Sequence, residues 1–191
     1  MQPYQGIDLL NLEDQLTDDE RQVRDTVRDW IEREAMPVVV PAFEDATFPK
    51  PLIDGMANLG VFGAHIDGYD CAGLGPVAYG LIMQELERCD SGLRSTASVQ
   101  TSLVMYPIWK YGSEEQKMKY LPKLATGEWI GCFGLTEPDH GSNPGGMVTS
   151  YVEDGDDVIL NGAKMWISNS PFAEIAVVWA KNEEGRIHGL I

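Results

Sequence analysis

The hydrophobic period of this sequence changes near residue 127, and this change constrains the fold more than any other feature. Before it, apolar residues recur at helical spacing; after it, short runs alternate between apolar and polar residues. Such runs, rich in β-branched and aromatic residues and separated by glycine turns, are typical of strands. The sequence therefore predicts an α+β fold: an N-terminal all-α helical domain (residues 1–128), followed by the start of a β-barrel-like domain (residues 129–191).

Two capping boxes mark the starts of predicted helices. Thr17 is followed three residues later by Glu20, and Ser113 is followed at the same spacing by Gln116. Pro37 is predicted to end the first of these helices. The stripe of this helix that is predicted to face the core consists of Val23, Val27, Trp30 and Ile31.

Two further helices are predicted between these boxes. One covers residues 75–90, and a less polar one covers residues 91–112 with a break near Pro107. The core stripe predicted for the first consists of Val77, Leu81, Ile82 and Leu86. The strands predicted after Gly127 are residues 129–135, 147–153, 157–162, 164–169 and 175–181, with Asp-Gly and Asn-Gly turn signals at 154–155 and 161–162.

The charge balance limits the partners of this chain. Thirty acidic residues against 14 basic ones give the 191 residues a net charge of −16 at pH 7. Nucleic acids and anionic membranes are also negative, so neither is predicted as a general partner. An anionic ligand therefore needs a local site rich in cations or backbone amides. The hydrophobic fraction of 43% is enough for a buried core, so the chain is predicted to be globular.

Cysteine spacing and the N-terminal sequence bear on location. Cys71, Cys89 and Cys132 are widely separated and match neither a zinc site nor a disulfide framework. Residues 1–20 have no basic segment that leads into an apolar run, and no run reaches the roughly 18 apolar residues of a membrane span. The sequence predicts no metal site, no membrane insertion and a cytoplasmic location.

The stretch "FGLTEPDHGSNPGG" (residues 133–146) is a candidate ligand loop. Its glycines allow backbone amides to approach a planar or anionic ligand closely, while the hydroxyls of Thr136 and Ser142 can form hydrogen bonds. The alternative is a long connection whose hydroxyls satisfy local turns. The glycine spacing matches neither a dinucleotide fingerprint nor a Walker loop.

The stretch "KMWISNS" (residues 164–170) is a second candidate. On a strand, an indole and a hydroxyl could lie beside a ring system and one of its heteroatoms. Taken alone, Trp166 is better explained as a core residue.

Together these segments resemble the acyl-CoA dehydrogenase family. "FGLTEPDHGSNPGG" resembles its flavin loop, "KMWISN" its second flavin strand, and "YGSEEQKMKYLPKLATGE" the helix that precedes them. The likeness extends from about residue 15 to the end of the chain. Within the family, "ELERCDSGLRSTASVQTSLVMYPI" resembles the glutaryl-CoA dehydrogenases. The resemblance implies FAD as the cofactor and an acyl-CoA thioester as the substrate.

The resemblance also implies binding residues. The loop residues that would line the flavin are Phe133, Gly134, Leu135 and Thr136. The Thr136 hydroxyl would bond to the ring, Trp166 would cover one ring face, and Ser168 would form a hydrogen bond near the reacting nitrogen. Ser142 would contact the pantetheine or phosphate part of CoA.

Arg94 bears on the substrate. It lies in a predicted helix among mainly apolar or small neighbours, so from the residues alone it either extends its charge to water or has an anionic partner. The resemblance implies the second: in glutaryl-CoA dehydrogenases an arginine at this place binds the distal carboxylate, Ser95 assists, and a glutamate like Glu87 lies close by. This assignment implies oxidation of glutaryl-CoA and its decarboxylation to crotonyl-CoA.

No residue of this chain matches the catalytic base that the resemblance implies. In the family that base is a glutamate of a C-terminal helical bundle, which is absent from this chain, and Glu137 is predicted to be structural. The alternatives are a catalytically silent flavin- and acyl-CoA-binding assembly subunit, or a dehydrogenase for another dicarboxylyl- or aromatic acyl-CoA. The family further implies an electron-transfer flavoprotein as acceptor and a homotetramer.

Overall fold

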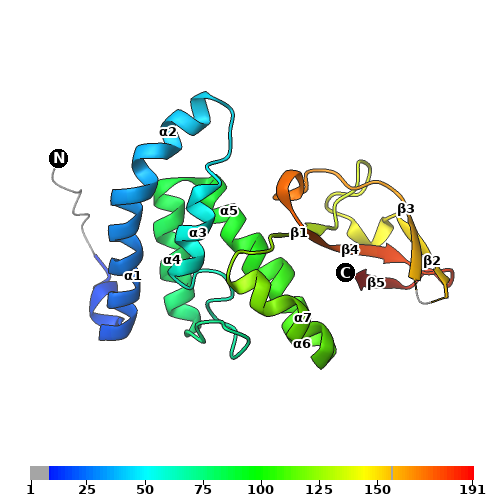
Figure 1. Cartoon of the computed structure of the whole chain (residues 1–191), viewed down its shortest axis with the longest axis horizontal. Coiled ribbons are helices and arrows are strands. Elements are labelled where there is room, and N and C mark those ends of the chain that lie inside the picture. Colours follow the sequence, from blue (N-terminus) through cyan, green and yellow to red (C-terminus); the bar gives the residue numbers. More distant parts are fainter. Residues whose placement is uncertain (1–8, 156) are drawn as a thin grey trace.

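The structure is a computed structural model that describes residues 9–155 and 157–191. The expectation that no leader is present concerns residues 1–20 and lies partly outside the described residues. Helices occupy the described chain up to Ala125, and strands begin at Gly131. The two parts lie side by side along the long axis of the molecule, with β1 at their junction (Figure 1). The predicted order, a helical part followed by the start of a sheet part, is confirmed.

The helical part contains long and short helices joined by irregular turns. The α-helices are α1 (Asp18–Trp30), α2 (Met36–Glu44), α3 (Pro51–Asn58), α4 (Pro76–Cys89), α5 (Ser91–Ser98), α6 (Tyr106–Tyr111) and α7 (Glu114–Ala125). Two π-helical segments, η2 (Ile31–Ala35) and η3 (Val99–Met105), join α1 to α2 and α5 to α6 without a break. Short 3-10 turns are η1 (Leu12–Gln15), η4 (Pro144–Gly146) and η5 (Ser170–Phe172). Both predicted capping boxes are present.

The prolines do not end helices where the sequence predicts that they should. Pro37 is predicted to stop the first helix and Pro107 to break a later one, and both predictions are wrong. Before Pro37, the Met36 N–H donates to the Ile31 carbonyl five residues back, and a bond of the same span precedes Pro107. A proline lacks an N–H and crowds the carbonyl four residues back. A widened π turn just ahead of each proline allows the helix to continue.

A buried charge lies where α1 packs against α4. The predicted core stripe of α1 is buried or half-buried, but in α4 Val77 is 48% exposed, contrary to prediction, while Glu85 is fully buried. Glu85 accepts hydrogen bonds from Arg28 at 2.7 and 3.1 Å and from Arg88 at 3.0 Å. Burial opposes its ionisation, yet these two arginines lower the pKa of Glu85 below its usual value. The charge of the buried Glu85 carboxylate is thus balanced by the two arginines.

The strands form one mixed sheet in the described residues. They are β1 (Gly131–Gly134), β2 (Ser150–Asp154), β3 (Asp157–Asn161), β4 (Ile175–Lys181) and β5 (Ile187–Leu190). The order is β1-β4-β2-β3, and β5 also pairs with β4. β4 runs parallel to β1, with Gly131 opposite Ile175, and antiparallel to β5. β2 and β3 form an antiparallel hairpin around the Asp-Gly turn signal.

The predicted strand at residues 164–169 is wrong, because this segment is an irregular loop. Trp166 has φ 62° and Asn169 has φ 69°, and left-handed residues interrupt the extended backbone that a strand needs. The loop is still fixed to the sheet, because the Asn169 side-chain amide donates to the Gly131 carbonyl at 3.1 Å. The sequence pattern identified the segment but not its backbone.

One buried side chain joins the helical part to the sheet. Gln100, in η3, donates from its amide nitrogen to the carbonyls of Leu124 and Trp129, both at 2.9 Å. Its amide oxygen accepts from the Gly131 N–H at 2.8 Å. Gly131 also lies directly against Val104, because an added Cβ would be 2.5 Å from a Val104 methyl carbon. The chain that leaves α7 and enters β1 is therefore held against η3.

Replacing Gln100 with leucine should test this junction. Leucine fills a similar volume but leaves buried backbone groups without partners, and each such group costs about 1–3 kcal/mol. We expect a loss of about 3 kcal/mol or more in the free energy of unfolding, measured by urea denaturation. The control is Gln84→Leu on the exposed side of α4, which should change stability by less than about 0.5 kcal/mol. If both substitutions changed the free energy of unfolding equally, this would contradict the role of Gln100 in holding the junction together.

Candidate flavin and acyl site

Predicted flavin residues from two separate segments meet in one hollow. It lies where η3, the end of β1 and the loop after β3 come together, and it has a volume of about 250 Å³. Its lining residues are Val99, Leu103, Phe133, Leu135, Thr136, Trp166, Ile167 and Ser168. The sequence predicted the other lining residues but not Ile167, Val99 and Leu103. The only signal for Val99 and Leu103 is their four-residue spacing on one side of an apolar helix.

Gly134 does not belong to the lining of this hollow. An added Cβ on Gly134 would lie in ordinary contact with the Cγ of Lys164, at 3.4 Å, so Gly134 packs beside the lysine stem. The Lys164 ammonium continues to the Leu135 carbonyl, to which it donates at 3.1 Å. In this structure Gly134 is a packing position beside Lys164.

Trp166 is the most unusual residue of the hollow. Its side chain is 85% exposed, so its interpretation as a core residue is wrong. Its φ of 62° is an outlier for a bulky residue and costs on the order of 1–3 kcal/mol. Because the indole is exposed to solvent, packing against the described residues does not offset the cost of this strained backbone. It is the arrangement expected where a planar ligand covers the ring.

Two hydroxyls of the hollow are available to a ligand. Thr136 is half-buried and Ser168 is exposed, and neither hydroxyl has a hydrogen-bond partner within residues 9–155 and 157–191. The Met165 N–H donates to the Thr136 carbonyl at 2.9 Å, which ties the two segments together. A flavin ring presents flat aromatic faces and an edge of heteroatoms. An exposed indole, apolar walls and free hydroxyls fit that ring, so these residues fit FAD.

Glu137 holds the loop in place beside the hollow. It is 2% exposed and accepts hydrogen bonds from the N–H groups of Val148 (2.7 Å) and Thr149 (3.0 Å) and from the Lys164 ammonium (2.9 Å). Burial opposes its ionisation, but the hydrogen bonds from Thr149, Val148 and Lys164 outweigh it and lower the pKa of Glu137 to about 2. Its partners are thus internal, which supports the prediction that it is structural.

Arg94 has an anionic partner in the structure. Its Nε donates to Glu87 at 2.6 Å and its Nη1 to the Ser98 hydroxyl at 3.2 Å. The Arg94 guanidinium, followed by a hydrogen bond from Ser91, lowers the pKa of Glu87. In the described part of the chain Nη2 has no partner. Arg94 thus combines a fixed orientation with a free donor, and snorkelling alone does not describe it.

The other two predicted substrate residues lie in different settings. Ser95 precedes Val99 by four residues on the continuous helix α5–η3, and Leu103 follows at the same interval, so Ser95 is placed on the side that reaches the hollow. Ser142 is exposed in the loop just before η4 and does not line the hollow. Neither Ser95 nor Ser142 lines the hollow itself, and Ser95 lies one helical turn before the lining residue Val99.

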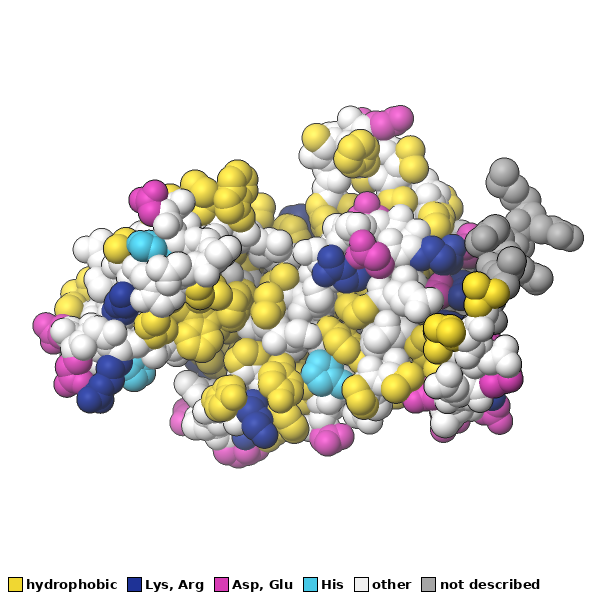
Figure 2. All heavy atoms as spheres, turned by 180° about the vertical axis from the view of Figure 1, so that it is seen from behind, with side chains coloured by type: hydrophobic (Ala, Val, Ile, Leu, Met, Phe, Trp, Pro, Cys, Tyr) yellow, Lys and Arg dark blue, Asp and Glu magenta, His cyan; other side chains and the backbone are white. Residues whose placement is uncertain are grey.

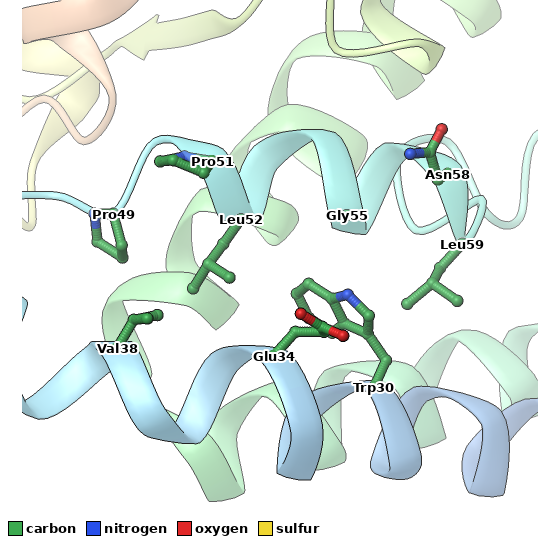
Figure 3. Close-up of a pocket in the computed structure, with 9 residues that line it drawn as sticks. All are labelled: Trp30, Glu34, Val38, Pro49, Pro51, Leu52, Gly55, Asn58 and Leu59. Carbon is green, nitrogen blue, oxygen red and sulfur yellow. The ribbon is translucent and has the colours of Figure 1, made fainter.

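A larger hollow in the helical part contains none of the predicted site residues. It measures about 480 Å³ and lies between α1–η2–α2 and α3, with the Trp30 indole against Gly55 (Figure 3). Nearby, α2 projects from the other helices and exposes hydrophobic side chains at its end (Figure 2), where Phe43 is 81% exposed. Among the described residues, none of the helices is long and apolar enough to span a membrane, and no acidic, histidine or cysteine group could hold a metal ion.

The sequence matches two adjacent family models. The acyl-CoA dehydrogenase N-terminal domain matches residues 17–128, and the acyl-CoA dehydrogenase middle domain matches residues 132–191. The mouse (Mus musculus) mitochondrial short-chain specific acyl-CoA dehydrogenase is 34% identical over 173 residues, which are 90% of this chain and 42% of the relative.

Two solved structures are similar to this one. A glutaryl-CoA dehydrogenase from Mycobacterium smegmatis in complex with FADH2 is 52% identical, with a TM-score of 0.91 over 95% of this chain and 47% of that chain. Butyryl-CoA dehydrogenase from Megasphaera elsdenii is 34% identical, with a TM-score of 0.81 over 87% of this chain and 45% of that one. The chain spans about half the length of these relatives.

Glu137→Gln should destabilise the protein in a pH-dependent way. A pKa lowered from 4.5 to about 2 corresponds to about 3 kcal/mol of stability, present above the unfolded pKa and lost as the pH falls toward 2. We expect the parent to exceed the variant by about 3 kcal/mol in urea unfolding at pH 7, and by about half as much near pH 3. The exposed control Glu153→Gln should show little difference at either pH. If the difference in free energy of unfolding between parent and variant did not change with pH, this would contradict an ionised Glu137 with internal hydrogen bonds.

Proposed function

The chain belongs to the acyl-CoA dehydrogenase family, and we propose that it contributes the flavin-binding and acyl-binding walls of an FAD-dependent glutaryl-CoA dehydrogenase. The observation that carries the flavin part is the hollow in which the strained, exposed indole of Trp166 lies with the free hydroxyls of Thr136 and Ser168. A similar chain with 52% identity was solved with FADH2, which supports the same cofactor here.

FAD, when bound, supplies the hydride acceptor that oxidises the acyl thioester between its α and β carbons. The chain's own residues bind and orient that ring. Thr136 and Ser168 offer hydrogen bonds to its heteroatoms, Trp166 covers a face, and Val99 with Leu103 excludes water from the other wall. No acidic residue is in the lining, and Glu137 is occupied by internal hydrogen bonds. The base that removes the α proton therefore comes from outside this set of residues.

Arg94 supports a substrate with a distal carboxylate. It precedes Val99 by five residues, about 7.5 Å along the helix, and in this proposal its long side chain extends to the distal carboxylate of an acyl tail that enters beside the flavin. Glu87 holds Nε and Ser98 holds Nη1, which leaves Nη2 for an anion. Ser95 is placed to assist on the same helix. Oxidised glutaryl-CoA could then lose CO2, because the resulting carbanion is delocalised into the thioester.

A neutral short-chain acyl-CoA is the second candidate substrate. The observation that favours it is the Arg94–Glu87 ion pair, which already balances the arginine charge at 2.6 Å. The likeness to short-chain specific and butyryl-CoA dehydrogenases agrees with it. A silent assembly subunit and a dehydrogenase for other dicarboxylyl or aromatic acyl-CoAs are the remaining alternatives. An electron-transfer flavoprotein as acceptor, a homotetramer and a contact of Ser142 with CoA remain predictions from the resemblance, and a cytoplasmic location remains a prediction from the cysteine pattern and the N-terminal sequence.

Trp166→Ala should weaken flavin binding without weakening the fold. Because the indole is 85% exposed and buries little in the described chain, we expect the melting temperature of the cofactor-free protein to change by no more than a few degrees. Loss of a ring-covering aromatic should lower FAD occupancy after gel filtration and shift the visible flavin spectrum. The matched control is Phe43→Ala, an exposed aromatic on α2. Equal flavin retention in the two variants would place the flavin elsewhere.

Arg94→Met should separate the two candidate substrates. Methionine keeps much of the side-chain volume but removes the charge. If bound substrate buries its carboxylate against Arg94, loss of one partner of that buried charged pair costs about 2–5 kcal/mol. We expect kcat/KM for glutaryl-CoA to fall by about thirty-fold to several thousand-fold in the complete protein, with little change for a neutral acyl-CoA of five or six carbons.

Two outcomes of that comparison would contradict the glutaryl assignment. An equal loss on both substrates would mean that Arg94 supports the fold rather than the carboxylate. A parent protein that already prefers the neutral substrate would favour the short-chain candidate.

A further inference from the structure

Lys164 and Glu137 form a buried ion pair between the two segments that line the flavin hollow. Lys164 Nζ lies 2.9 Å from Glu137 Oε1, and the side chains are 12% and 1% exposed. Glu137 comes directly after Leu135 and Thr136 in the chain, and Lys164 lies two residues before Trp166. Neither Lys164 nor Glu137 lines the hollow itself.

The pair fixes each segment by a backbone contact as well. The Lys164 ammonium donates to the Leu135 carbonyl at 3.1 Å, while Glu137 accepts the Val148 and Thr149 N–H groups that close the glycine loop. Next to the pair, the Met165 N–H donates to a carbonyl of the opposite segment. The Leu135–Thr136 segment and the Trp166–Ser168 segment are thus joined by this ion pair and by the backbone hydrogen bond beside it.

The lock matters because both segments are otherwise hard to hold. Trp166 has a left-handed backbone and an exposed side chain, and Ser168 is exposed in a turn. A ligand that needs both segments binds only the fraction of molecules in which they are aligned, and its apparent affinity falls in proportion to that fraction. An internal ion pair that keeps them aligned removes this penalty in advance.

We propose that Lys164 and Glu137 are positioning residues for the flavin, which hold the Leu135–Thr136 segment and the Trp166–Ser168 segment in binding geometry before the cofactor arrives. Neither side chain lines the hollow that receives the ring; both act through the residues that do. The inference rests on the proposed flavin binding. It adds that the affinity for FAD depends on a charged contact outside the cofactor's own lining.

Lys164→Met tests the proposal against a matched change elsewhere. The control is Arg28→Met, which removes a cation from another fully buried glutamate, Glu85, in the helical part. FAD is titrated into the cofactor-free protein, and its dissociation constant is measured by flavin fluorescence together with the visible spectrum of the bound ring. We expect Lys164→Met to raise the dissociation constant about tenfold or more and to alter the spectrum, because alignment drops to about one molecule in ten or fewer. Arg28→Met should change it less than about twofold.

A double variant distinguishes a pair from two independent residues. If Glu137 and Lys164 act as one unit, Glu137→Gln combined with Lys164→Met should weaken FAD binding no more than the worse single change. Should Lys164→Met not fold, Lys164→Gln keeps a hydrogen-bond donor without the charge and should still raise the dissociation constant relative to Arg28→Met.

The outcomes separate this inference from the proposed function. A parent protein that binds no FAD overturns the proposed function. A parent that binds FAD, with Lys164 and Arg28 variants that lose equal affinity, leaves flavin binding intact and overturns the positioning role, because the losses then follow general stability.

Discussion

The position of the hollow proposed for the flavin depends on the Gln100 side chain, which holds the helical part against the sheet. Gln100 makes three hydrogen bonds to backbone groups on both sides of the turn that leads from α7 into β1, and it is fully buried. Its neighbour Val99 lines the hollow, as does Leu103 one turn later. If Gln100 did not set the position of β1 against η3, the loop that follows β1 would have no fixed helical wall opposite it. A neutral amide suits this place, because it can donate and accept at once without the cost of a buried charge.

Pro107 accounts for the π-helical form of η3. A proline has no N–H to donate and crowds the carbonyl four residues back, and the wider π turn ahead of it relieves this crowding. Widening also changes which residues face a given side, so Val99, Gln100 and Leu103 can serve the hollow and the junction within one segment. π turns are frequent at functional sites for this reason. An equivalent π turn precedes Pro37, beside the hollow between α1–η2–α2 and α3.

Features that depend on residues close together in the sequence could be predicted from it, but contacts between residues far apart in the sequence could not. The capping boxes at Thr17 and Ser113 and the order of helices and strands followed from short patterns. Loop residues such as Thr136 and Trp166 were named through a family likeness, and the structure brings them into one hollow. The strand predicted at residues 164–169 is absent, because an alternation of apolar and polar residues does not reveal which residues have a left-handed φ. Gln100 and the Glu137–Lys164 pair gave no sequence signal, since each depends on partners many residues away.

The balance of charge around Arg94 reconciles an acidic protein with an anionic substrate. A net charge of −16 repels an acyl-CoA at long range, but this repulsion is screened beyond about 8 Å at physiological ionic strength. Under the proposed function, binding therefore depends on the local electrostatic field at the end of the acyl tail. Glu87 orients the guanidinium and cancels part of its charge, so the free donor at Nη2 acts as a directed hydrogen-bond donor more than as a bare cation. If Arg94 binds the distal carboxylate as proposed, such a site favours a carboxylate at one defined distance from the thioester. Acyl length would then matter as well as charge, since a shorter or longer diacid would leave its carboxylate out of line with Nη2.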